Sequence, residues 1–251
     1  MLSCILLGMA ALLVGGLIGT VGVGGILLIP ALGVFAGLST HMSMATALLS
    51  FVFTGVLGTW LYQRHGSIDW RITIPICLGS LLFGGPGAMV NGCVSARLLN
   101  LLLGSIILFA GFYALFPARA GLAVARDAVG GKRFLLLTGI GGLVGFGSGL
   151  TGVGGPVLSV PLMVILGFSP LTSIATGQVI QIAAALSGSL GNAANGVIDY
   201  GTAAWVTCLE LAGVAAGARL AHAISMNLLK KIVSIVCILV GALILTRALG
   251  A

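Results

Sequence analysis

The chain contains two copies of one glycine string, 130 residues apart. Residues 22–25 read GVGG, and residues 152–155 read GVGG again. The same offset relates GSIDW at 66–70 to GVIDY at 196–200. It also pairs single residues throughout the two halves, among them Gly15/Gly145, Gly19/Gly149, Thr46/Thr176, Gly58/Gly188 and Gly87/Gly217. The sequence is therefore an internal duplication.

The composition places this duplicated chain in a membrane. Hydrophobic residues make up 59% of the sequence and charged residues 6%, whereas about a quarter of a soluble domain is charged. The net charge of +7 would suggest a nucleic-acid partner in a soluble protein, but here the basic residues lie between apolar stretches, where they orient helices in a bilayer. We expect an all-α, polytopic protein of the plasma (inner) membrane, in contact with lipid and without nucleic acid.

The apolar segments repeat in the same order in both halves. In the first half they are residues 1–21, 26–38, 42–62, 72–90 and 98–116, and in the second half 134–150, 156–168, 171–194, 202–223 and 232–249. A segment of about 18 residues or more can span a bilayer as a helix. The 13-residue segment after each GVGG is too short for that, so we expect each to be a half helix or a re-entrant arm.

A short polar stretch separates the halves. Residues 117–133 have the composition of a linker and contain the largest basic cluster of the chain. We expect this linker to be cytoplasmic and to join membrane repeat 1, residues 1–116, to membrane repeat 2, residues 134–251. Long apolar repeats with glycine-interrupted segments at matching positions are typical of secondary transporters, whose binding site lies where the repeats meet.

The distribution of basic residues predicts how the halves are oriented. If each GVGG region is one broken crossing, the eleven Lys and Arg residues divide seven to four between the two sides. If the chain doubles back at each GVGG, nine lie on one side and only Arg97 and Arg247 on the other. The second arrangement follows the positive-inside rule more closely. It predicts inverted repeats with the N-terminus outside, whether the GVGG regions are re-entrant hairpins or pairs of short crossings.

The glycine strings have the properties of an anion site. Glycine permits positive φ and lets a ligand approach the main-chain amides, and Pro156 suits the first turn of a helix. A helix that begins there would direct its free amides towards an anion. The expected substrate-binding residues of the two strings and their flanks are Gly22, Gly24, Gly25, Ser148, Thr151, Gly152, Gly154 and Gly155. The alternative is that these glycines only allow close helix packing.

The segment after each glycine string supplies polar side chains. Thr46, Ser50 and Thr54 follow an i, i+4, i+8 spacing, which places three hydroxyls on one face of a helix. Thr176, Gln178 and Gln181 follow in the second half. Amides are costly in hydrocarbon unless they have partners. We expect Thr46, Ser50, Thr176, Gln178 and Gln181 to line the substrate site, with hydrogen bonding between helices as the alternative.

One acidic residue lies near the middle of a predicted membrane helix. Glu210 follows Tyr200 by ten residues, and an ionised carboxylate at such a depth is expensive. Glu210 is therefore a candidate for proton coupling, although a permanently protonated structural role is also open. Its counterpart in the first half is Ser80, so this acid does not belong to a site shared by both repeats.

The remaining polar residues indicate capping and no catalysis. Asp69 and Asp199 precede predicted helices, where a carboxylate caps free amides. The five cysteines lie singly in apolar segments, and the histidines share no metal-site spacing. We find none of the sequence motifs of hydrolases, metalloproteases or nucleotide-driven pumps. We therefore expect no enzyme, no cofactor and no metal.

The glycine strings also resemble a known family. GxxGxxGVGGxxxxP near the start, GxIDW after the following helix and a second GxGGxxxxxP are similar to motifs of the TauE/SafE family of sulfite and sulfoacetate exporters, over residues from about 12 to 249. The family motif falls on Gly19, Gly22, Gly24, Gly25 and Pro30, and on Gly149, Gly152, Gly154, Gly155 and Pro161. The chain departs from it with Thr20, where serine is frequent, and Ile26, where glycine is frequent.

This resemblance implies a polytopic membrane protein that moves sulfur-containing anions. We expect a secondary transporter that exports sulfite, thiosulfate or organosulfonates. Glu210 is the candidate for coupling this transport to protons. The alternative is an uncoupled channel or facilitator for a small anion or neutral solute. Small residues at Gly213, Gly217 and Ala221 suit contacts within the bundle or between the subunits of a homodimer.

Overall fold

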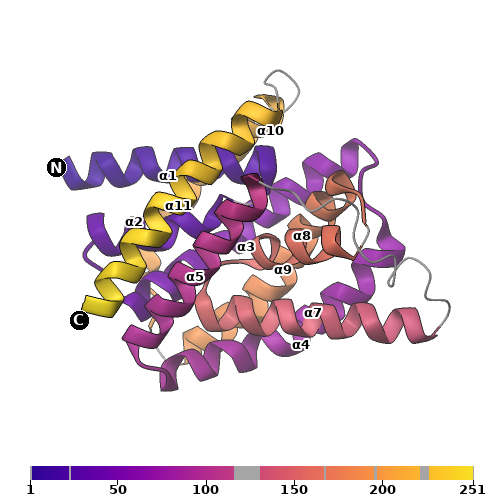
Figure 1. The fold of residues 1–251 in the computed structure, drawn as a ribbon, viewed down its shortest axis with the longest axis horizontal. Helices are drawn as coiled ribbons and strands as arrows, with labels where there is room; N and C mark the ends of the chain where they lie inside the picture. Colours follow the sequence, from indigo (N-terminus) through magenta and orange to yellow (C-terminus); the bar gives the residue numbers. More distant parts are fainter. Residues whose placement is uncertain are drawn as a thin grey trace.

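The computed structural model describes residues 2–22, 24–115, 131–166, 168–194, 197–220 and 226–250, and these residues form a bundle of α-helices (Figure 1). The helices are α1 (Leu2–Val21), α2 (Leu28–Phe35), α3 (Thr40–Arg64), α4 (Trp70–Cys93), α5 (Ala96–Leu115), α7 (Gly131–Thr151), α8 (Gly155–Ile165), α9 (Pro170–Ala194), α10 (Tyr200–Leu220) and α11 (Met226–Gly250). A single 3₁₀ turn, η1 (Gly25–Leu27), precedes α2. The expected all-α polytopic fold is confirmed: within the described residues, six helices are long and apolar enough to cross a membrane.

The helix starts follow the predicted capping. Asp69 accepts a hydrogen bond from the amide of Arg71 at 3.0 Å at the start of α4. Asp199 does the same for Thr202 at 3.0 Å at the start of α10. A carboxylate at such a position satisfies an amide that has no partner within the helix. Both acids therefore fix where a membrane helix begins.

The chain reverses direction at each glycine string. After α1 it turns at Gly22, which has a positive φ, and returns through η1 and the eight-residue α2, which packs against α1. After α7 it turns through residues 152–154 and returns as the eleven-residue α8, which packs against α7 and α9. Figure 1 shows both reversals. A helix of eleven residues covers only about 16 Å, so α2 and α8 are half helices.

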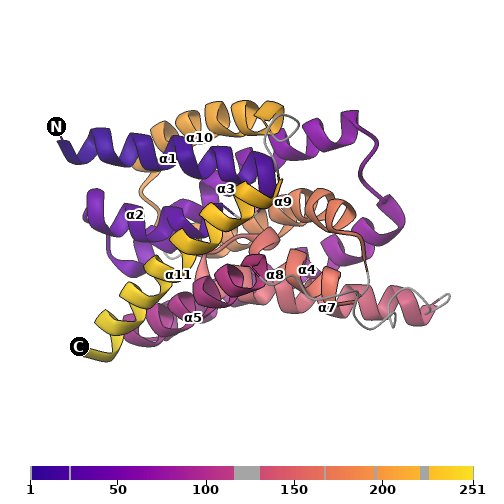
Figure 2. The same ribbon diagram turned by 45° about the horizontal axis from the view of Figure 1, so that its top comes forward.

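The helices of the two halves are interleaved. The first helix of each half packs against the fourth helix of the other half, α1 against α10 and α7 against α4. The third helices, α3 and α9, pack against each other in the centre of the bundle, and α5 packs against α11 at the periphery (Figure 2). Each half therefore depends on the other for its helix contacts.

Equivalent contacts recur at the offset of 130 residues. Gly15 lies against the backbone of Glu210, as Gly145 lies against the backbone of Ser80. The following glycines repeat the pattern: Gly19 meets Val214 and Gly149 meets Gly84, while Gly22 meets Ile174 and Gly152 meets Met44. Gly213 and Gly217 contact Leu12 and Gly16 of α1, so these two small residues serve contacts within the bundle. Ala221 lies outside the described residues.

The first helices of the two halves run in opposite directions. α1 and α7 are antiparallel in both ribbon views, and both chain ends lie at the same side of the molecule (Figures 1 and 2). Inverted repeats require such an arrangement. The inversion relative to the membrane remains a prediction, as do the boundaries of the two repeats. Of the predicted linker, residues 117–133, the part up to residue 130 lies outside the described residues.

Candidate functional site

The two glycine strings meet at one aromatic ring. Phe51, in the middle of α3, is 1% exposed. A Cβ atom placed on Gly25 would lie 2.8 Å from Cζ of this ring, and one placed on Gly154 would lie 3.1 Å from its Cδ2. The ring of Phe51 therefore lies between the GVGG turn of the first half and that of the second half.

The backbone of these turns needs glycine at specific positions. Gly22 has φ +77°, and Gly152 and Gly154 have φ +68° and +82°, values that other residues rarely adopt. Gly24 instead has φ −81°, and a Cβ there would lie 2.6 Å from the carbonyl oxygen of Val14. The strings thus have the positive-φ turns that an anion site would need and also the close packing of the alternative; the anion site stays a prediction.

Gln181 joins the two central helices. Its Nε2 donates to the carbonyl oxygen of Phe51 at 3.0 Å and to Oγ1 of Thr54 at 2.8 Å. Residues 51 and 181 are equivalent in the two halves, so α3 and α9 cross at matching positions. A Cβ on Gly155, at the start of α8, would lie 3.0 Å from the amide nitrogen of Gln181. Gln181, a residue of α9, therefore bonds to α3 and lies close to the second glycine string.

Gln178 lies one turn away and is only partly satisfied. It is fully buried, and its Nε2 donates to the carbonyl oxygen of Ile18 at 3.5 Å. Its Oε1 has no hydrogen-bond partner among the described residues and lies over Gly58 of α3. A Cβ on Gly22 would be 3.4 Å from Nε2. A buried polar atom without a protein partner is rare in folded proteins, so Gln178 stays a candidate for contact with a polar ligand.

Glu210 lies beside the hydroxyl stripe of α3. Its side chain is fully buried, and the Ser50 hydroxyl of α3 lies near its carboxyl group. That interaction is not a well-formed hydrogen bond, because neither carboxyl oxygen has a partner of good geometry among the described residues. The Ser50 hydroxyl donates instead to the carbonyl oxygen of Ala47 at 2.8 Å. The acid therefore adjoins α3 one residue before Phe51.

Three of the other predicted site residues make hydrogen bonds within the protein. Thr46 accepts a hydrogen bond from the amide of Asp199 at 3.1 Å, and Thr176 pairs with the Thr73 hydroxyl at 3.1 Å. Thr151 donates to the carbonyl oxygen of Gly147 at 2.6 Å. Ser148 is fully buried, and its hydroxyl has no partner among the described residues. Thr46 and Thr176 thus hold the start of a neighbouring helix, while Ser148 resembles Gln178 in being unsatisfied.

The residue that sequence reasoning did not select is Phe51. An aromatic residue in a membrane helix is ordinarily packing, and nothing in its neighbours distinguishes it. The sequence feature that could have identified Phe51 is its equivalence to Gln181 at the offset of 130 residues, because equivalent residues of two repeats meet near their shared axis. No group of three or more His, Cys, Asp or Glu suited to a metal occurs in the part of the chain that the structure describes.

The fold and this central cluster define a class of protein. A polytopic bundle with two half helices, and with buried polar side chains where its halves meet, has the organisation of a membrane transporter. Comparison with known proteins gives the family. A family profile described as Sulfite exporter TauE/SafE matches residues 4–244, and the chain belongs to this family of multi-pass cell-membrane proteins.

Curated relatives carry transporter names. The chain is 29% identical over 269 residues to "Probable membrane transporter protein YunE" of Bacillus subtilis (strain 168), with 94% of each protein covered. It is 24% identical over 242 residues to "Probable membrane transporter protein YdhB" of the same organism, with 93% of this chain and 96% of that protein covered. A "Probable membrane transporter protein" of Xylella fastidiosa (strain 9a5c) is 30% identical over 122 residues, covering 47% of each. No solved structure gives a significant match.

Proposed function

We propose that this protein is a secondary transporter that exports sulfur-containing anions such as sulfite, thiosulfate or organosulfonates. The observation that carries the proposal is the convergence of both glycine strings on Phe51, where α3 and α9 cross. The family description, sulfite exporter, supports this substrate class and direction. The substrate would bind among the two turns, Gln178 and Gln181.

Neutral donors would hold the anion in this site. The first amides of α8 have no partner within the helix, and amides at a helix start carry a partial positive charge. The Nε2 group of Gln178, whose hydrogen bond to the carbonyl oxygen of Ile18 is long at 3.5 Å, adds a side-chain donor. Gln181 would have to release one of its bonds to Phe51 or Thr54 in order to donate to the anion. A site without a fixed cation suits a transporter, because the anion must leave on the other side of the membrane as readily as it enters.

The burial of the centre supports a carrier over an open channel. Ser50, Gln178 and Gln181 are at most 2% exposed. A channel needs a continuous polar path, whereas a carrier passes through a conformation in which its site is closed to both sides. We infer that the halves rock against each other about the crossing of α3 and α9, so that the glycine turns are exposed alternately.

Glu210 is our proposed proton carrier. A carboxyl group without a well-formed hydrogen bond inside a membrane is costly when ionised, so its protonation would alternate with the exposure of the site. Its interaction with Ser50 links it to α3. Protonation of Glu210 would then bias the position of α10 against α3 and couple a pH gradient to the movement of the anion.

Ligand-dependent stability tests the proposed substrate class. Purified protein is heated in detergent with sulfite, thiosulfate, sulfoacetate, sulfate or chloride at matched ionic strength. A bound anion stabilises the folded state by about 2.7 kcal/mol at a hundred times its dissociation constant, so one sulfur anion should raise Tm in a saturable manner. The same anion should have a smaller effect on Gln178→Leu. If no sulfur anion raises Tm more than chloride does, the proposal is wrong.

A further inference from the structure

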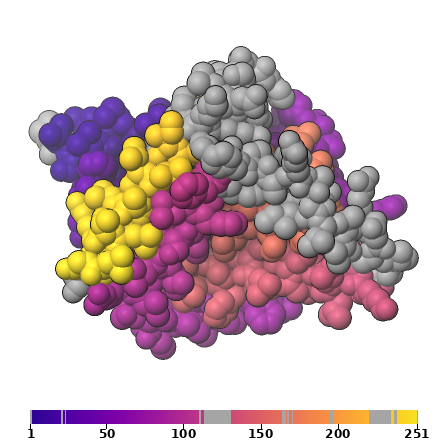
Figure 3. Space-filling model, viewed as in Figure 1, coloured from indigo at the N-terminus to yellow at the C-terminus, as the bar shows by residue number. Residues whose placement is uncertain are grey.

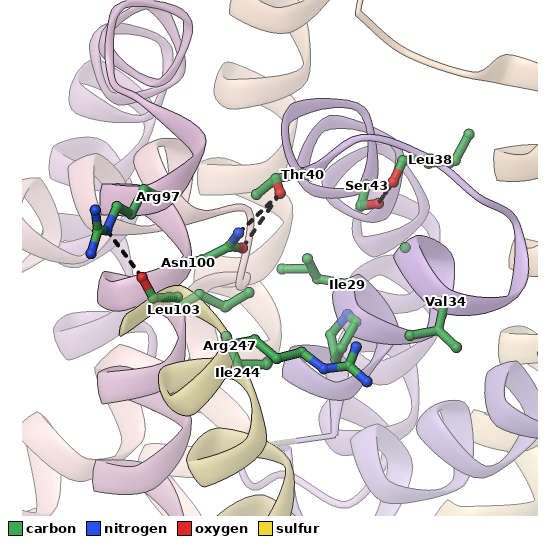
Figure 4. A pocket seen from close by; sticks show the side chains of 13 residues that line it. Ile29, Val34, Leu38, Thr40, Ser43, Arg97, Asn100, Leu103, Ile244 and Arg247 are labelled. Carbon is green, nitrogen blue, oxygen red and sulfur yellow. Dashed lines mark hydrogen bonds between the residues drawn. The ribbon is translucent and has the colours of Figure 1, made fainter. Parts of the chain in front are cut away.

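A separate cavity lies beside α2, at the side of the bundle where the chain ends. It has a volume of about 410 Å³ and is bounded by α2, the start of α3, α5 and the end of α11 (Figure 4). Ile29, Gly33 and Val34 line it from α2, and Thr40 and Asn100 are among its polar residues. Figure 3 shows that α5 and α11 lie side by side on the surface here. We call this cavity the arginine pocket, because Arg97 and Arg247 both line it.

The two arginines differ in what they contact. The Nε of Arg97 donates to the carbonyl oxygen of Ala248 at 3.0 Å, so Arg97 satisfies carbonyl groups at the end of α11. No hydrogen bond or ion pair joins Arg247 to another residue in the described ranges. In Figure 4 its side chain extends from α11 across the pocket towards α2. Arg247 is therefore the cation that the pocket offers to a ligand.

No described acid neutralises this charge. Asp69, Asp199 and Glu210 do not line the pocket. Thr40 and Asn100 are hydrogen-bonded to each other across it at 3.3 Å, which adds a hydroxyl and an amide near the arginines. Cations in a recess with apolar walls concentrate anions and can raise their association rate by about 10- to 1,000-fold.

The pocket also follows α2 towards the glycine turn. Its lining runs from Val34 back to Ile29, which is four residues after Gly25. Of the eleven basic residues, only the two that line this pocket lie opposite the cytoplasmic side in the predicted topology. We propose that the arginine pocket is an oxyanion-binding vestibule on the outer side of the membrane, next to the half helix that leads to the central site. The proposal rests on the proposed function for its role in transport, but not for the binding itself.

A charged thiol reagent measures the local potential without any transport. Gly33→Cys supplies the reporter, because a Cβ there would be no closer than 3.8 Å to its nearest neighbours, Leu38 O and Ser43 Oγ. The five native cysteines are first replaced by serine or alanine. Anionic and cationic methanethiosulfonates are then applied from outside to right-side-out vesicles, and the ratio of their reaction rates is determined.

We expect Arg247→Gln to lower the anionic-to-cationic rate ratio by about tenfold at low salt, and Arg247→Lys to leave it nearly unchanged. The effect of Arg247→Gln should disappear in about 0.5 M salt, where charges are screened over a few ångströms. The matched control is a variant that retains only Cys93, which is exposed and outside the pocket. A ratio at Gly33→Cys that does not respond to Arg247→Gln would overturn the proposal.

Protection of the same cysteine identifies the source of the oxyanion. If millimolar sulfate, which does not react with methanethiosulfonates, slows labelling in phosphatidylcholine vesicles, the ligand is a free anion from the medium. If labelling is slowed only when phosphatidylglycerol is present, the ligand is a lipid headgroup phosphate. Either result supports oxyanion binding, and protection by neither would contradict it. If the labelling experiments give the expected results but no sulfur anion is transported, the proposed function is wrong and the proposal of an oxyanion-binding pocket is still supported.

Discussion

Positions 51 and 181 are equivalent in the two halves, yet one carries a phenylalanine and the other a glutamine. The same division occurs one turn away, where Leu48 is equivalent to Gln178. Leu48 lies against Gly188 as Gln178 lies against Gly58. Duplication thus conserved the shape of the helix crossing, while the two halves came to supply different chemistry. The two carboxamides of the proposed site belong to α9, while α3 faces them with Leu48 and Phe51 and with the hydroxyl of Thr54.

The position of Gln178 allows its role in anion binding to be tested by single substitutions. Gln178→Leu should raise KM for the transported anion by about tenfold, which corresponds to the roughly 1.4 kcal/mol of one lost hydrogen bond. Gly58→Ala should have a similar effect, because a Cβ there would lie 2.9 Å from Cδ of Gln178 and displace the carboxamide. Initial rates of anion uptake in proteoliposomes measure both.

Combining the two variants distinguishes a shared cause from independent damage. If Gly58→Ala acts through Gln178, the double variant should be no worse than Gln178→Leu alone. Additive losses would mean that Gly58 matters for helix packing only. Unchanged KM in Gln178→Leu would remove this side chain from the site.

Glu210→Gln tests proton coupling. The amide keeps the size of the carboxyl and cannot exchange a proton, so transport driven by a pH gradient should be lost. Exchange of the anion between the two sides should remain within about threefold of wild type, because the amide has the size and the neutral charge of a protonated carboxyl group. Stimulation of Glu210→Gln by a pH gradient to the wild-type extent would show that the acid is structural.

At the scale of elements, glycine faces hold the interleaved helices together. α7 approaches α4 closely at Gly145 and Gly149, and α1 approaches α10 at the equivalent Gly15 and Gly19. Close approach of backbones drives helix association in membranes, where burial of apolar surface gives no advantage over lipid. The positions of these glycines therefore determine which helices pair.

Gly149→Ala should weaken the contact between α7 and α4. A Cβ there would lie 2.8 Å from the amide nitrogen of Ala88, a backbone atom that cannot move independently. Such overpacking costs about 1–3 kcal/mol, which thermal unfolding monitored by size-exclusion chromatography would detect as a lower Tm. Gly139→Ala, on the same helix with no atom within 4 Å of its Cβ, is the control and should be neutral or slightly stabilising. Equal Tm values for both variants would contradict this account of pairing.

For the whole molecule, the apolar run lengths and turn residues were sufficient to predict the helices. The predicted segment 72–90 lies within α4, and the two segments too short to cross became the half helices α2 and α8. The contact of Ser50 with Glu210 could not be predicted, because the rotation of α10 against α3 depends on packing with α1. The arginine pocket joins residues from both ends of the chain, which no local pattern reveals.

The predicted orientation of the molecule can be tested with cysteines. Cys93 is exposed at the end of α4, and Gly131 begins α7 with open space around it. In otherwise cysteine-free variants, an impermeant maleimide should label Cys93 in intact cells and Gly131→Cys only after permeabilisation. The reverse pattern would invert the topology and place the arginine pocket in the cytoplasm.

The central claim is that an anion binds where the two glycine strings meet and is carried across by alternating exposure. Counterflow tests it most directly, because it depends neither on the coupling ion nor on net charge movement. Proteoliposomes loaded with an unlabelled sulfur anion are diluted into medium that contains a trace of the ³⁵S-labelled form. We predict transient accumulation of label for sulfite, thiosulfate or an organosulfonate, and reduced accumulation in Gln178→Leu at subsaturating anion. Absence of accumulation for all of these anions in wild-type protein that is folded and monodisperse would contradict the account.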